Sequence, residues 1–211
     1  MPMFLTDGKS NYDAVLAELL EEARSRNAAA NAPALGGSLV DGSAQIPLFG
    51  DICTVKDDAV YKSDPKLDTI GSILVLRYLL AAGDDPLRNA WVPYRDFKDG
   101  AQFASYIKAN IEDLLAKTFT RNQALLRERL QAIGASMYRS EAKPDVAAAL
   151  HPFPRVPLLV IFWDKDEEFD ASFQFLFDES AESFLDMEAL AVLLEYTCQK
   201  LIGEPGGTSR P

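Results

Sequence analysis

One stretch of this chain, residues 154–178, constrains the fold more than any other. It contains the uninterrupted apolar run LLVIFW at residues 158–163. A run of this length, rich in β-branched and aromatic side chains, is typical of a strand that is buried on both faces. The acidic segment 164–170, hereafter the acidic turn, separates it from a second, partly alternating run at 172–177. Two strands joined by a short polar loop predict an antiparallel hairpin across 157–178, which we place at the centre of a sheet.

Helical periodicity predicts about five helices around this hairpin. Apolar side chains recur at intervals of three and four residues in five segments, which span residues 12–26, 69–82, 101–117, 122–133 and 186–203. The second segment has almost no polar face, so we expect that helix to pack against the sheet. The chain is therefore predicted to have an α+β fold, in which a small antiparallel sheet is packed by about five helices.

Other segments carry signals for loops and short strands. Residues 27–50 are rich in Ala, Gly, Ser and Pro without any period, so we predict a mobile loop there. Residues 51–62 are expected to form a small hairpin. Residues 91–97 predict an edge strand or an extended segment, because Pro93 cannot donate a hydrogen bond to a ladder.

Two further segments lie before the central hairpin and at the end of the chain. The alanine-rich segment 145–150 is expected only to lead into the central hairpin, and residues 204–211 are predicted to be a disordered tail. No long linker divides the chain into periodic halves. We therefore expect a single domain over residues 1–211.

Charge and composition exclude several classes of protein. The formal net charge is −11, and residues 164–188 carry −9 of it. This balance argues against a nucleic-acid partner, which requires a basic face. The chain has no apolar run long enough to span a membrane and no secretory signal. Its two cysteines, Cys53 and Cys198, lie far apart and are interpreted as reduced thiols of a soluble cytoplasmic protein.

The acidic turn is the first candidate for chemistry. Asp164, Asp166, Glu168 and Asp170 recur at every second residue, and such oxygen-rich spacing can hold a divalent cation. The turn does not match a calcium-binding loop, because a phenylalanine, Phe169, stands where the glycine is required. The alternative, which we favour, is a solvated acidic turn. A hydrolase-like enzyme that uses these carboxylates with a divalent cation is the corresponding functional hypothesis.

Four large side chains with polar tips form the second candidate. Trp91, Arg95, Arg155 and Trp163 lie near the expected strand ends, and with the acidic turn they could line a ligand or partner site. The favoured alternative is that the tryptophans belong to the core, while both arginines neutralise the acidic turn. A zinc site is not expected, because His151 is the only histidine and the two cysteines lack ligand spacing.

Several motifs resemble those of a known family. They are the segment PRVP at 154–157, Trp163 with DEEF at 166–169, and LFDESA at 176–181. The sequence resembles the uncharacterised family catalogued as domain of unknown function 3786, found mainly in anaerobic bacteria and archaea. Some relatives add a cysteine-rich segment that looks like an iron–sulfur cluster site, and the two cysteines of this chain cannot form one. The resemblance implies a family and a setting, and no established activity or catalytic residues.

These observations lead to three functional hypotheses. The first is a soluble, cytoplasmic, non-catalytic domain that binds a partner protein or a small ligand. The second is an enzyme that uses the acidic turn with a divalent cation. The third, which rests only on the setting of the resembling family, is an accessory factor for corrinoid or iron–sulfur enzymes.

Overall fold

The computed structural model describes residues 9–62, 66–81 and 83–203, and the predicted disordered tail lies outside these residues. The helices are α1 (Lys9–Ser25), α2 (Thr69–Leu80), α3 (Ala101–Ile107), α4 (Asp113–Phe119), α5 (Gln123–Ala132) and α6 (Met187–Ile202). A π-helical turn, η3 (Lys108–Glu112), joins α3 directly to α4, so these three form one interrupted helix. Counted in this way, the described residues contain the five predicted helices. Short 3-10 turns are η1 (Ala28–Asn31), η2 (Tyr94–Asp96) and η4 (Ala181–Ser183).

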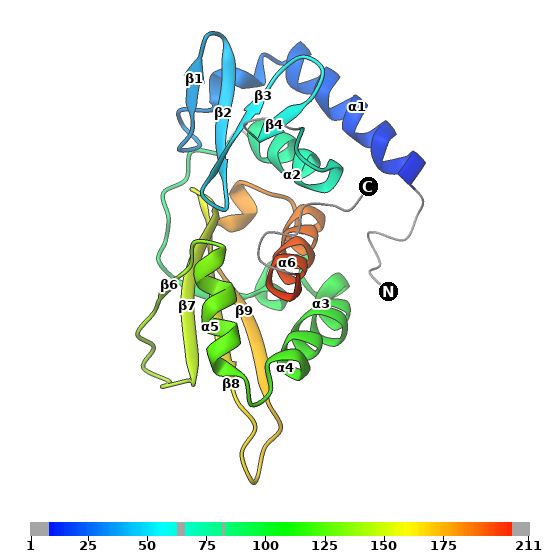
Figure 1. Cartoon of the computed structure of the whole chain (residues 1–211). Helices are drawn as coiled ribbons and strands as arrows, with labels where there is room; N and C mark the ends of the chain where they lie inside the picture. The colour runs from blue at the N-terminus through cyan, green and yellow to red at the C-terminus, as the bar shows by residue number, and fades with distance from the viewer. Residues whose placement is uncertain (1–8, 63–65, 82, 204–211) are drawn as a thin grey trace.

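The strands form two antiparallel sheets, shown in Figure 1, and the predicted central hairpin belongs to the larger one. The smaller sheet has the order β1-β2-β3-β4, and its strands are β1 (Ser38–Val40), β2 (Ser43–Leu48), β3 (Asp51–Val55) and β4 (Val60–Lys62). The larger sheet has the order β5-β9-β8-β7-β6, and its strands are β5 (Trp91–Pro93), β6 (Ser136–Met137), β7 (Val146–Phe153), β8 (Val156–Trp163) and β9 (Ser172–Asp178). The α+β class is therefore confirmed.

The predicted central hairpin is β8 and β9. The two strands pair in antiparallel register, with Val160 opposite Phe175, and β8 is the middle strand of the larger sheet. Every residue of β8 except Trp163 is buried. The prediction of a strand buried on both faces is therefore confirmed, because the apolar run LLVIFW loses contact with water on both sides.

Strand β7 covers the alanine-rich segment that was expected to lead into the central hairpin and was not assigned to a strand. It pairs with β8 along most of its length, with Ala148 opposite Val160. Alanine is depleted in strands, so its run here gave no strand signal. The pairing with β8 decides the structure, because both neighbours of a central strand must satisfy its backbone groups.

Residues 27–50 were predicted to be a loop without regular structure, and this is wrong. They contain η1, β1 and β2, and β2 buries Ala44, Ile46 and Leu48 on one face. The turn between β1 and β2 is the pair Asp41–Gly42, and both residues have positive φ, 49° and 78°. A two-residue hairpin loop with positive φ at both positions favours Asp-Gly. The glycine-rich composition thus serves a tight turn.

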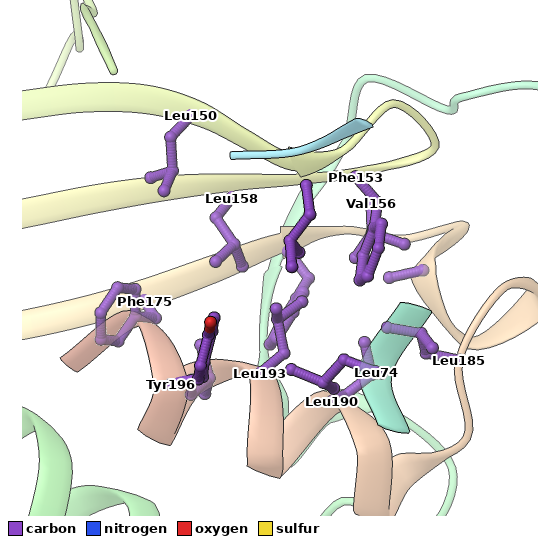
Figure 2. Packing of buried hydrophobic residues seen from close by; sticks show 14 of the residues in the cluster. Leu74, Leu150, Phe153, Val156, Leu158, Phe175, Leu185, Leu190, Leu193 and Tyr196 are labelled. Atoms are coloured by element: carbon purple, nitrogen blue, oxygen red, sulfur yellow. The ribbon is translucent and has the colours of Figure 1, made fainter. Parts of the chain in front are cut away.

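One contiguous core connects the two sheets. Helix α6 lies over the inner face of the larger sheet, where Leu193 and Tyr196 face Leu158 and Phe175, while Leu190 lies beside Leu74 of α2 (Figure 2). Helix α2 packs between α1, α6 and β2, and eight of its twelve residues are buried while none is exposed. The near absence of a polar face on this helix had predicted a central position. The single-domain prediction stays a prediction, with which this shared core agrees.

Candidate ligand-binding groove

The carboxylates of the acidic turn bond to the chain around them rather than to one another. Asp164 accepts hydrogen bonds from the backbone N–H groups of Arg121 (2.7 Å) and Lys165 (2.8 Å). Asp166 accepts two from amides of its own turn, and these lower the pKa of its carboxyl group. Lys165 forms an ion pair with Asp170. Each of these three carboxylates therefore has a hydrogen-bond or ion-pair partner within the chain.

These carboxylates do not assemble a cation site. Glu168 is exposed, as are Asp166 and Asp170, and the turn projects from the free end of the hairpin (Figure 1). Across the described part of the chain, no three side chains of His, Cys, Asp or Glu gather as metal ligands would. The observed contacts fit the favoured interpretation, a solvated acidic turn.

The prediction that two arginines neutralise the acidic turn is wrong. Arg155 lies at the opposite end of β8, where its guanidinium donates to the carbonyl oxygen of Ala34 (3.3 Å). Arg95 is exposed, and its described ion pair is with the neighbouring Asp96 (3.5 Å). The position of Arg155 follows from chain direction, because a hairpin places its connecting turn and the origin of its first strand at opposite ends.

The two tryptophans share the outer face of the larger sheet but lie near opposite ends of it, Trp91 opposite Asp178 of β9 and Trp163 opposite Ser172. Trp91 and Trp163 are half-buried and pack with Leu159 and Leu176 in a small cluster separate from the main core. The Trp91 ring also meets the Tyr138 ring edge-on at 6.2 Å. The structure therefore places both tryptophans on one face of the sheet without bringing them into one site, and Arg95 and Arg155 lie elsewhere.

A groove between two helices is the better candidate. It lies between the interrupted helix α3-η3-α4 and the C-terminal half of α6, and we call it the helix groove. Its volume is about 510 Å³, within the range of small-molecule sites. Its lining is mostly apolar and consists of Tyr106, Ala109, Asn110, Ile111, Leu114, Lys117, Glu195, Cys198, Gln199, Ile202 and Gly203.

Glu195 is the unusual member of this lining. The residue is only 5% exposed, and neither carboxyl oxygen accepts a hydrogen bond from a residue that the structure describes. Burial raises the pKa of Glu195 to about 7, and the positive charge of the amino terminus and the Tyr106 hydroxyl each offset a smaller part of that rise. Buried polar groups are almost always hydrogen-bonded, so an unsatisfied buried carboxyl group is an exception that requires an explanation.

Cys198 lies one helical turn after Glu195 in the same lining. It is a free cysteine and is 4% exposed. Burial, and to a lesser extent the charge of Glu195, raise the pKa of its thiol to about 12. The thiolate is the reactive form of cysteine, so this side chain acts as a small apolar group of the wall.

The π-helical turn η3 shapes the groove and also supports the larger sheet. Ala109, Asn110 and Ile111 belong to the groove lining. At the other end of the turn, Glu112 accepts a hydrogen bond from the backbone N–H of Phe175 in β9 (3.0 Å). That N–H lies beyond the last residue of β5, which ends opposite β9 at Pro93. π-helical turns occur frequently at functional sites.

The motif LFDESA has a structural explanation. Asp178, at the end of β9, is buried and accepts hydrogen bonds from the backbone N–H groups of Arg88, Asn89 and Ser180 and from the Ser180 hydroxyl. Burial alone would raise the pKa of Asp178, but these hydrogen bonds outweigh burial and lower it. This carboxylate holds the segment before β5 against the end of β9, and it leaves no unused acceptor for a ligand.

Sequence reasoning missed Glu195 because a glutamate in a helix is usually taken to face water. The available signal was its position in LLEYTC at 193–198, a part of α6 that has no polar face. A charged residue within such a helix is buried, and it therefore requires a partner or a shifted pKa.

The fold and the groove define a class: an α+β domain with two antiparallel sheets on one core and a helix-lined groove beside it. The chain belongs to the family described as domain of unknown function (DUF3786), which matches residues 27–200. Comparison with curated proteins and with solved structures found no match. Among the described residues, no helix has the length and apolar character needed to cross a membrane.

Proposed function

We propose that this chain is a non-catalytic binding domain whose ligand is a small molecule held in the helix groove. The observation that carries the proposal is the buried carboxyl group of Glu195, which receives no hydrogen bond from the described residues. Ligand sites combine mostly apolar walls with a few polar groups that fix orientation, and the helix groove has this composition.

Binding is favoured over catalysis by the chemical groups in the groove. Nucleophilic catalysis needs an activated nucleophile, and the raised pKa of Cys198 keeps its thiol protonated. The enzyme hypothesis based on the acidic turn gains no support, because Asp164 and Asp166 are occupied by local hydrogen bonds. Of the two expected kinds of ligand, the groove favours a small molecule over a partner protein.

We also infer a cytoplasmic location. Cys53 and Cys198 are both buried and free, and both have a raised pKa that disfavours the thiolate. Unpaired, buried thiols are usual in reducing compartments.

Ligand-observed NMR screening of a fragment library tests the proposed function. Ala109→Trp fills the groove from its exposed rim, while Ala132→Trp makes the same change on the exposed surface of α5. We expect fragments that bind the native chain to lose binding in Ala109→Trp and to keep it in Ala132→Trp. Fragments that bind both variants equally, or the absence of any binding fragment, would overturn the proposal.

A further inference from the structure

We propose that the ligand of the helix groove is a monoamine: one ammonium group on an apolar alkyl or aryl body, with the ammonium group paired to the carboxylate of Glu195. This inference rests on the proposed function and names its ligand class. It is argued from the unused acceptors, the charges around them and the apolar walls.

The first argument is the number of unused acceptors. An ionised carboxylate offers about four acceptor positions, and a primary ammonium group carries three donors. Both oxygens of Glu195 are buried and accept nothing from the described residues. Hydrogen bonds between charged groups are stronger than neutral ones, and a site that excludes water strengthens them further. A ligand ammonium group can therefore supply up to three donors to these acceptors, beside the Tyr106 hydroxyl, whose hydrogen bonding lowers the pKa of Glu195.

The second argument concerns the charged and titratable groups that face Glu195. Tyr106 of α3 contributes a hydroxyl, and Cys198 of α6 contributes a protonated thiol, so neither brings a positive charge. The positive charge of the amino terminus, which lowers the pKa of Glu195, belongs to a residue outside the described part of the chain. Lys117 of α4 belongs to the groove lining and is exposed. Among the described residues, it forms no salt bridge with Glu195. The side chain of Lys108 extends instead toward Glu112 and Asp113.

The third argument limits the ligand to one charge. Ile111, Leu114 and Ile202 give the groove apolar walls, which bind an alkyl or aryl body by removing it from water. Lys117 is the cationic residue of the lining and would repel a second ammonium group. A polyamine is therefore excluded in favour of a monoamine, and a carboxylic acid is disfavoured because its charge would approach that of Glu195.

Isothermal titration of the full chain with three probes tests this inference. Hexylamine, hexanol and hexanoate share one apolar body and differ in the charge of the head group. We expect hexylamine to bind at least about tenfold more tightly than hexanol at neutral pH, which corresponds to one good charge-assisted hydrogen bond. Glu195→Gln is expected to abolish this preference. Glu128→Gln, the same change on the exposed surface of α5, is expected to keep it.

The pH dependence of binding gives a second readout. Below about pH 7 the affinity for hexylamine should fall by up to about tenfold per pH unit, because Glu195 takes up a proton and loses its charge. Binding of hexanol should change little over the same range. In Glu195→Gln, the affinity for hexylamine should lose this pH dependence.

The possible failures are distinguishable. If hexanol or hexanoate binds as tightly as hexylamine, and Ala109→Trp removes that binding, the amine inference is overturned while the ligand groove stands. If hexylamine binding is unchanged in Glu195→Gln, the inference is also overturned. If none of the three probes binds and the fragment screen also fails, both the inference and the proposed function are wrong.

Discussion

Two carboxyl groups of this protein are both buried, but they differ in the hydrogen bonds that they accept and in the direction in which their pKa values are shifted. Asp178, at the end of β9, is 1% exposed and accepts four hydrogen bonds, three of them from backbone N–H groups. Glu195, in the middle of α6, is 5% exposed and accepts none from the described residues. The pKa of Asp178 is lowered, whereas that of Glu195 is raised to about 7.

This difference separates a structural carboxylate from a functional candidate. A buried charge surrounded by donors is stabilised by its own fold and has no acceptor left for a ligand. A buried carboxyl group without donors destabilises the folded chain unless it is protonated or meets a partner from outside. Among these two, only Glu195 in the helix groove therefore has a reason to bind something.

The largest expected effect is the loss of Asp178. Asp178→Ala leaves the N–H groups of Arg88, Asn89 and Ser180 without their acceptor, so we expect the free energy of unfolding to fall by about 4 kcal/mol. Denaturant unfolding measures this change. The control is Glu179→Ala, which removes an exposed ion pair with Arg88 and should cost less than about 1 kcal/mol. Equal losses in the free energy of unfolding in the two variants would contradict the structural role assigned to Asp178.

The second effect has the opposite sign. The pKa of Glu195 is higher in the folded chain than in the unfolded chain, so the native protein is most stable relative to Glu195→Gln at acidic pH. That advantage is lost as the pH rises from about 4.5 through about 7. We compare the free energy of unfolding of Glu195→Gln with that of the native chain at each pH. Between pH 4 and pH 8 this difference should shift in favour of the variant by up to about 3 kcal/mol. Urea unfolding across this pH range measures the change, and a constant difference would contradict it.

The carboxyl group of Glu112 is intermediate between those of Asp178 and Glu195, because it accepts a single backbone hydrogen bond. Burial raises the pKa of Glu112, while its hydrogen bond from the Phe175 N–H lowers it by a smaller amount. We expect Glu112→Ala to cost about 1–2 kcal/mol, because a backbone donor at the edge of β9 loses its acceptor. Hydrogen exchange of the Phe175 amide should become faster in this variant. It should stay unchanged in Asp113→Ala, and faster exchange in both would contradict this assignment.

The smallest effects are expected in the acidic turn. Asp166→Asn keeps the oxygen that accepts from the Glu168 and Phe169 amides, so stability should change by less than about 0.5 kcal/mol. Calorimetric titration of the native chain with calcium or magnesium should show no binding up to millimolar concentration. Cation binding that disappears in Asp166→Asn would support the hypothesis of a cation site in the acidic turn.

Sequence patterns were sufficient where one local signal dominated. The apolar run 158–163 predicted β8, and the all-apolar pattern of residues 69–82 predicted that α2 is central. Strand β7 was missed because its alanines carry a weak strand preference and only pairing with β8 fixes them. The hairpin of β1 and β2 was missed although Asp41–Gly42 is a strong turn signal, because the surrounding composition was interpreted as a loop.

The helix groove could not be predicted from sequence in the same way. It exists because α4 and α6, which are far apart in the sequence, pack side by side and leave space between their ends. No local pattern encodes that packing. The acidic turn, by contrast, is conspicuous in the sequence, and Asp166 and Asp170 in it are paired within a few residues. A single glutamate in the apolar helix α6 was the more informative charge.

A pH titration of the Glu195 carboxyl carbon by ¹³C NMR, in the full chain with and without hexylamine, tests the central claim most directly. The account predicts a midpoint at about 7 in the free protein, because the carboxyl group is buried without a partner. Hexylamine should lower this midpoint, because its ammonium group stabilises the ionised form. A midpoint at or below about 4.5 in the free protein, the value of an ordinary glutamate, would contradict the account.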